Sequence, residues 1–126
     1  MEINTHMRFL GRKMAEIEAG PILIIDELVA KPGETDRLLA AYLDRYAPGA
    51  RSRGMSLAHS WRGAAPGEDE LARTLVFVWS VPGIWPWWQM RFQAGADPEV
   101  AAWWDEAAAM IERRSRRLMT EGATHA

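Results

Sequence analysis

Residues 22–46, ILIIDELVAKPGETDRLLAAYLDRY, contain a complete strand–turn–helix pattern. The first nine residues are rich in β-branched side chains, which predicts a strand ending at Lys31-Pro32-Gly33. In residues 34–46, apolar side chains recur at helical spacing and charged side chains lie between them. An amphipathic helix is therefore expected after the turn, and Pro48-Gly49 is expected to end or kink it.

Two further strands are expected, at residues 55–62 (MSLAHSWR) and 74–81 (TLVFVWSV). Strict alternation in the first of them would place four larger side chains on one side: Met55, Leu57, His59 and Trp61. Two helical segments follow, at about residues 84–92 and from residue 98 onward. Residues 113–119 fit either a continuation of the second helix or a fourth strand.

Composition predicts one globular domain. The chain has 126 residues, of which 48% are hydrophobic and 25% charged. We expect the domain to span residues 20–120, with an arm or short helix at 1–19 and a tail at 121–126. The chain has no cysteine, which excludes disulfides, thiolate metal sites and cysteine nucleophiles.

Charge and hydropathy narrow the classes of partner. A formal net charge of −2 gives no general attraction to nucleic acid. The apolar runs are too short to cross a membrane, and the N-terminus has no apolar stretch of signal-peptide length, so a cytoplasmic location is expected. Phosphate-binding loops, dinucleotide fingerprints and metal-ligand spacings are missing, so no cofactor and no metal are expected.

The order of elements predicts an α+β fold, an antiparallel sheet with helices packed on one face. Such a sheet normally alternates apolar with polar side chains, but the strands at 22–30 and 74–81 are apolar on both faces. Leaving one of these faces in water would forfeit several kcal/mol at about 25 cal/mol per Å². A homodimer in which a second copy covers the open face is therefore expected.

The chain resembles the dimeric α+β barrel superfamily, which includes antibiotic-biosynthesis-monooxygenase-like, NIPSNAP-like and EthD-like small proteins. The resemblance covers residues 21–119 and rests on LIIDELVAKPGETDRLLAAYLDR, the two later strands and the tryptophan-bearing helix. It implies a ferredoxin-like protomer, a dimeric barrel, and a cavity between sheet and helices. It also implies action on polycyclic or quinol-like compounds without a cofactor, although relatives of this kind have diverse functions.

Three residues are candidates for catalysis. His59 is the one histidine in a predicted element, and in an apolar setting a neutral imidazole acts as a base; a structural role is the alternative. Asp26 is expected on a covered face, either as a catalytic acid or in an ion pair with an arginine such as Arg62 or Arg91. Arg91 lies among aromatic residues, where it would hold an oxyanion or extend its head into water.

The tryptophans are concentrated in residues 85–104, which hold five of the seven. Trp103 and Trp104 follow a buried helical stripe, which favours core packing. Three rings at positions 85, 87 and 88 cannot all face one side. The predicted substrate pocket is lined by Trp61, Trp79, Trp88, Tyr42 and Phe77, with ordinary core and interface packing as the alternative. The basic residues of 113–117 are expected on a solvated face or at a dimer edge.

Two functions from different classes remain open. The first is a small cofactor-independent enzyme, monooxygenase-like or an isomerase or cyclase, acting on a hydrophobic aromatic or polyketide-like molecule. In it His59 would take a proton and Arg91 or an indole N–H would hold the oxyanion. The second is a non-catalytic homodimer that binds a small ligand or has a stress-related role.

Overall fold

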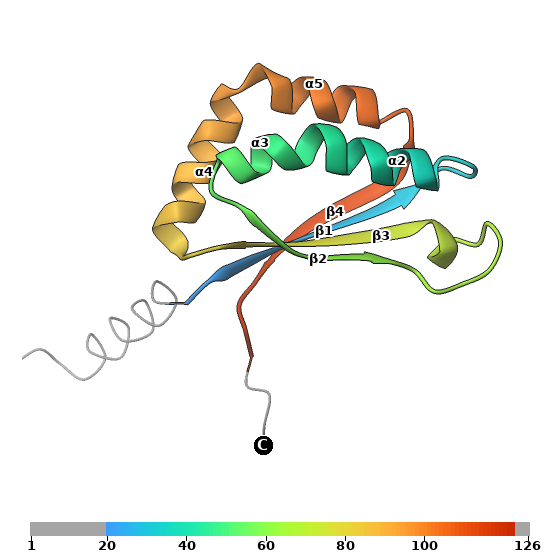
Figure 1. Ribbon diagram of the computed structural model, residues 1–126, viewed down its shortest axis with the longest axis horizontal. Helices are drawn as coiled ribbons and strands as arrows, with labels where there is room; N and C mark the ends of the chain where they lie inside the picture. Colours follow the sequence, from blue (N-terminus) through green and yellow to red (C-terminus); the bar gives the residue numbers. More distant parts are fainter. Residues whose placement is uncertain (1–19, 123–126) are drawn as a thin grey trace, which may run out of the picture.

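A four-stranded antiparallel sheet organises residues 20–122, the part of the chain that this computed structural model describes (Figure 1). Its strands are β1 (Ile22–Ala30), β2 (Ser56–Arg62), β3 (Thr74–Val81) and β4 (Ile111–Met119), in the spatial order β2-β3-β1-β4. The arm predicted at 1–19 and residues 123–126 of the predicted tail lie outside the described residues. Residues 113–119, which the sequence leaves open, belong to a strand.

The helices lie together on one face of the sheet (Figure 1). They are α2 (Thr35–Ala41), the π-helical turn η1 (Tyr42–Tyr46), α3 (Ala47–Ser52), α4 (Ile84–Ala96) and α5 (Pro98–Ala107), with a short 3-10 turn η2 (Leu71–Arg73) before β3. This arrangement confirms the predicted α+β, ferredoxin-like class. No helix within residues 20–122 is long and apolar enough to cross a membrane; the cytoplasmic location stays a prediction.

The first helical region is longer than the sequence pattern indicates. The helix does not end at Pro48-Gly49, as one of the two predicted alternatives had it, because helical structure continues to Ser52. Proline lacks an N–H and crowds the preceding turn. The chain accommodates it through η1, in which the Ala47 N–H donates to the Tyr42 carbonyl five residues back. The wider π-helical turn therefore lets the helical region continue past the proline instead of ending there.

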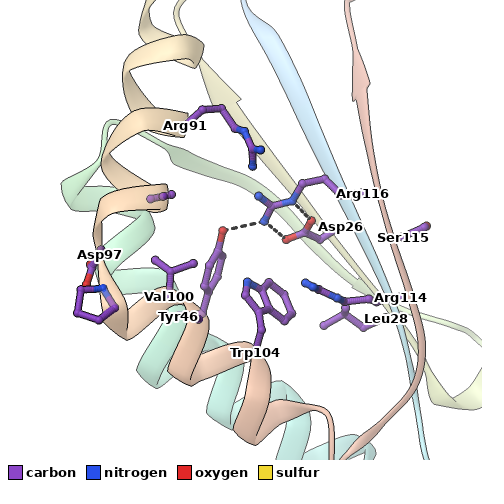
Figure 2. Close-up of a pocket in the computed structure, with 14 residues that line it drawn as sticks. Asp26, Leu28, Tyr46, Arg91, Asp97, Val100, Trp104, Arg114, Ser115 and Arg116 are labelled. Carbon is purple, nitrogen blue, oxygen red and sulfur yellow. Dashed lines mark hydrogen bonds and ion pairs between the residues drawn. The ribbon is translucent and has the colours of Figure 1, made fainter.

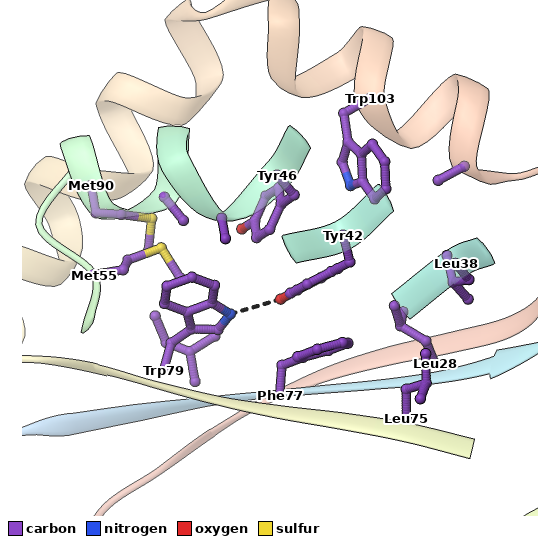
Figure 3. Packing of buried hydrophobic residues seen from close by; sticks show 14 of the residues in the cluster. Leu28, Leu38, Tyr42, Tyr46, Met55, Leu75, Phe77, Trp79, Met90 and Trp103 are labelled. Atoms are coloured by element: carbon purple, nitrogen blue, oxygen red, sulfur yellow. Dashed lines mark hydrogen bonds between the residues drawn. The ribbon is translucent and has the colours of Figure 1, made fainter. Parts of the chain in front are cut away.

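The core lies between the sheet and the helices (Figure 3). Large side chains from β1 and β3, including Ile24, Leu28, Phe77 and Trp79, meet the first helical region there, and all four are at most 1% exposed. α5 begins as predicted, because the Asp97 carboxylate accepts a hydrogen bond from the Glu99 N–H at 2.9 Å. Trp103, which the helical stripe predicts to be in the core, is buried.

β2 differs from the strict alternation expected of it. Leu57 pairs with Trp79, whose side chain is in the core, but His59 pairs with Val78 and Trp61 with Val76. A bulge at position 58 inserts one extra residue and reverses the faces beyond it. His59 and Trp61 consequently lie on the face away from the helices, and the expectation that they share a side with Leu57 is wrong.

Candidate functional site

A cavity of about 630 Å³ lies between the sheet and the α4–α5 pair (Figure 2). Its walls come from β1, β4, α4, α5 and the end of η1. The side chains most relevant to chemistry are Asp26, Tyr46, Arg91, Asp97, Trp104, Arg114 and Arg116. Its volume falls within the roughly 300–1,000 Å³ typical of small-molecule sites.

Asp26 is the polar centre of this cavity. Asp26 is 2% exposed, and its carboxylate accepts three hydrogen bonds, two from Arg116 and one from Tyr42. Arg116 Nε donates to Oδ1 at 2.5 Å and Arg116 Nη2 to Oδ2 at 2.8 Å, while Tyr42 donates to Oδ2 at 2.6 Å. The two arginine bonds make a bidentate pair, which compensates for the desolvation of the carboxylate.

Tyr42 connects this ion pair to the core. Trp79 Nε1 donates to the Tyr42 hydroxyl at 2.7 Å, and the Phe77 ring stacks on Tyr42 with centroids 3.7 Å apart (Figure 3). Burial, reinforced by the negative charge of Asp26, raises the pKa of Tyr42 far above its ordinary value. Tyr42 therefore remains a neutral donor that orients the carboxylate.

Arg116 reaches from β4 into the same network. Burial alone would lower the pKa of Arg116, but the hydrogen bonds and charge of Asp26 outweigh it, so the net pKa is raised above its ordinary value. Arg116 Nη2 also donates to the Tyr46 hydroxyl at 2.7 Å. Within residues 20–122, Arg116 Nη1 and the Tyr46 O–H donate no hydrogen bond, which leaves three hydrogens that a ligand could accept.

Two more arginines border the cavity from opposite walls. Arg91 extends from α4 towards Arg116 (Figure 2). Arg114, two residues before Arg116 on β4, lies over the Trp104 ring with its Cζ 3.9 Å from the centroid. This is a close cation–π contact, and it holds the guanidinium against the apolar part of the wall.

The structure places the predicted site residues in several environments. Asp26 and Arg91 line the cavity. Tyr42, Phe77 and Trp79 are fully buried in the adjoining core and are not among the lining residues. The expectation of an arginine partner for Asp26 is confirmed, but neither suggested arginine is that partner: Arg62 pairs with Asp36, and Arg116 takes the role.

The other predicted site residues lie away from the cavity. His59 stacks on Trp61 with centroids 4.8 Å apart, on the far face of the sheet. Trp88 is 48% exposed on α4, next to Trp87 at 4.7 Å. The structure does not bring Trp61, Trp79 and Trp88 together around one space. Ligand binding by these residues stays a prediction.

Sequence reasoning missed Arg116, Tyr46, Trp104 and Arg114 as lining residues. The basic segment is exposed, as expected of a solvated face, but Arg116 differs in that its side chain, 31% exposed, turns to Asp26. The usable signal was the spacing of Arg114 and Arg116 by two, which places both on one strand face. Their partner depends on the register between β1 and β4, where Asp26 lies opposite Arg116.

Within the described part of the chain, no group of three or more His, Cys, Asp or Glu side chains is arranged to hold a metal ion. The charged and phenolic side chains that line the cavity are guanidiniums and a phenol, which donate hydrogen bonds, and two carboxylates, which accept them and already have partners. This set is suited to binding oxygen atoms of an organic ligand.

Comparisons with known proteins identify the fold. No family model matches the sequence, and no curated protein is detectably similar to it. An uncharacterized NIPSNAP domain protein from Burkholderia xenovorans, 15% identical, aligns with a TM-score of 0.67 over 83% of this chain and 98% of its own. A NIPSNAP family protein of unknown function from Agrobacterium tumefaciens, 16% identical, gives 0.67 over 85% and 93%.

A protein of unknown function from Rhodopseudomonas palustris aligns over more of this chain, 97%, and 96% of its own, with 16% identity and a TM-score of 0.59. These likenesses confirm the NIPSNAP-like α+β fold that the sequence pattern suggested. At such low identities they concern the fold alone, and function has to be argued from the site.

Proposed function

We propose that the protein binds a small aromatic or polyketide-like molecule in the cavity beneath α4 and α5 and acts on it as a cofactor-independent enzyme. The observation that carries the proposal is the fixed group formed by Asp26, Arg116 and Tyr46. Asp26 orients the guanidinium, and the guanidinium is bonded to the phenol at 2.7 Å. Both Arg116 and Tyr46 line the cavity.

Such a group stabilises an oxyanion. When a phenol or a carbon next to a carbonyl loses a proton, negative charge collects on oxygen. Preoriented N–H and O–H donors lower the energy of that charge. In this proposal Arg116 and Tyr46 bind the oxygen, Asp26 positions Arg116, and the proton passes to water. Isomerase, cyclase and monooxygenase-like reactions share this anion, and its formation is the step we assign to the chain.

His59 has no part in this proposal, because it lies on the opposite face of the sheet from the cavity. The catalytic assignment of Asp26 also changes. Its carboxylate already accepts hydrogen bonds from Arg116 and Tyr42 on both oxygens, so it is a positioning residue rather than a proton acceptor.

A specific observation favours a second candidate, the non-catalytic binding protein. Among the described residues that line the cavity there is no histidine, and both carboxylates are engaged: Asp26 by Arg116, and Asp97 by the Glu99 N–H. A site without a free base still binds an oxygen-bearing ligand. The two candidates therefore share the cavity and differ in turnover.

We further propose that the protein is a homodimer whose copies meet through the open face of the sheet. On that face Leu23, Ile25 and Val76 are half-buried and Trp61 is 54% exposed. The helices shelter the other face (Figure 1). A specific interface buries about 800 Å² per partner, which is the area that this contact would have to cover.

The test is turnover on a panel of polycyclic phenols and enolisable aryl ketones, followed by mass spectrometry. Tyr46→Phe and Arg116→Lys are expected to lower the rate by about 10²–10³-fold, as for loss of an oxyanion donor. His59→Ala is the matched control and should leave it unchanged. Loss of turnover in His59→Ala, with Tyr46→Phe fully active, would contradict the proposal. Ligand binding without turnover in the parent protein would select the binding candidate.

A further inference from the structure

The charged side chains that line the cavity carry a net positive charge. Its lining contains three arginines and two aspartates. Asp26 is neutralised by Arg116. Asp97 caps α5 and lies 3.9 Å from Arg53, whose side chain is 7% exposed and does not line the cavity. Both carboxylates thus have cationic partners, and the positive charge of the remaining arginines is in excess.

The excess charge belongs to Arg91 and Arg114. Within residues 20–122, neither has a carboxylate within ion-pair distance. They come from different walls, Arg91 from α4 and Arg114 from β4. Both residues are exposed, so they give the rim of the cavity a positive charge that favours the approach of an anion.

The wall next to Arg114 is apolar. Trp104 lies under its guanidinium at 3.9 Å, and Leu28 and Val100 also line the cavity. A guanidinium held over an indole still has N–H groups that can bind the two oxygens of a carboxylate. A flat ring that carries the carboxylate then lies against the apolar side chains.

We propose that the ligand of this site is an aromatic carboxylate whose carboxylate is bound by Arg114, with Arg91 adding positive charge from the opposite wall, while its reacting oxygen faces Arg116 and Tyr46. This inference rests on the proposed function, in that both require an aromatic ligand in the cavity, and it adds the ligand's fixed negative charge. The structure thus divides the arginines between two tasks: Arg116 is fixed by Asp26, and the other two recognise the ligand.

The experiment is a calorimetric titration of the full chain with 2-naphthoate and with 2-naphthamide, which has the same shape and no charge. The parent protein should bind the acid about tenfold more tightly than the amide. Arg114→Gln should weaken binding of the acid about tenfold and Arg91→Gln by a smaller factor, and both should leave binding of the amide unchanged. Raising the salt concentration should weaken the acid alone.

Arg117→Gln is the matched control. Arg117 is on the same strand, pairs with Ile25 and therefore faces the opposite side, and its replacement changes the net charge by the same amount. It should bind both compounds as the parent does.

The outcomes separate the two proposals. Equal affinity for acid and amide would overturn the carboxylate assignment and leave the proposed cavity intact. Equal weakening of both compounds by Arg114→Gln would also overturn it, because the arginine would then act through packing. If the parent protein binds neither compound, the proposed function fails, and this inference fails with it.

Discussion

At the scale of single residues, the account depends on a carboxylate that the fold buries at the centre of its sheet. An isolated buried charge costs several kcal/mol, so Asp26 is stable there only because Arg116 and Tyr42 surround it. A change that removes one partner leaves the buried groups of the network, Asp26 and Tyr42, without a hydrogen bond they need. The same group that stabilises the fold also directs donors into the cavity, which links stability to function.

Asp26→Asn is expected to lower the free energy of unfolding by about 3 kcal/mol. Breaking a buried ion pair typically costs about 3–5 kcal/mol, and we expect the lower value because the Arg116 side chain retains 31% exposure. Urea unfolding followed by tryptophan fluorescence measures it. Glu27→Gln, one position along β1 on the opposite face, is the control and should change stability by less than about 0.5 kcal/mol. Equal effects of the two substitutions would show that the pair is not buried as described.

Alkaline titration tests the environment of Tyr42. The pKa of Tyr42 is raised in the folded protein by burial and by Asp26, while an unfolded tyrosine ionises near pH 10. The contribution of neutral Tyr42 to the free energy of unfolding is therefore fully present below about pH 10. It is lost as the pH rises further, because the tyrosine of the unfolded state releases its proton first.

The chain has two tyrosines, so the Tyr46→Phe variant reports Tyr42 alone. Its tyrosinate absorbance should appear only together with alkaline unfolding seen by circular dichroism. Ionisation near pH 10 in a protein that is still folded would show that Tyr42 is not buried against Asp26.

At the scale of elements, the departures from sequence expectation have local causes. The limits of β1 and β3 follow from β-branched residues and from proline and glycine, so they were predictable. The bulge at position 58 was not, because a single extra residue leaves no mark in an alternating pattern. The π-helical turn before Pro48 was likewise hidden, and β4 is mostly exposed, so its arginine-rich sequence lacks the apolar alternation that identifies a strand.

The contact between the end of β2 and η2 gives a prediction at this scale. A Cβ added at Gly63 would lie 1.8 Å from the Leu71 carbonyl oxygen, so Gly63→Ala must displace backbone. We expect a loss of about 2–3 kcal/mol in thermal or urea unfolding. Gly95→Ala in α4 meets nothing within 4 Å and should be neutral or slightly stabilising. Similar stabilities for the two variants would show that the β2–η2 approach is looser than described.

At the scale of the whole molecule, the fold class was predictable and the site was only partly so. The helix-covered face, the ferredoxin-like order and the cavity between the layers agree with the resemblance drawn from the sequence. Asp26 was identified as a site residue because its position in the first strand predicted a covered face, and Arg91 because aromatic residues surround it in the sequence. Arg116 and Tyr46 were not, because their contact with Asp26 depends on strand register and helix packing, which are set by tertiary structure rather than by local pattern.

The proposed dimer makes a prediction at this scale. Trp61→Asp places a carboxylate on the open face and should weaken self-association by at least about tenfold, because the core of an interface is depleted of charge. Sedimentation velocity over a range of concentrations measures this. Trp85 is 68% exposed on α4, so Trp85→Asp is the control and should leave association unchanged. A parent protein that is monomeric at all concentrations would contradict the proposal.

The central claim is that the ligand site lies between the sheet and α4–α5, and the indole N–H resonances of the seven tryptophans test it most directly. Each resonance is assigned by a single Trp→Phe variant, and the protein is then titrated with 2-naphthol. The account predicts that the Trp104 signal, from the cavity wall, moves with added ligand, while that of Trp61, on the far face of the sheet, stays fixed. Movement of the Trp61 signal with a stationary Trp104 signal would contradict it.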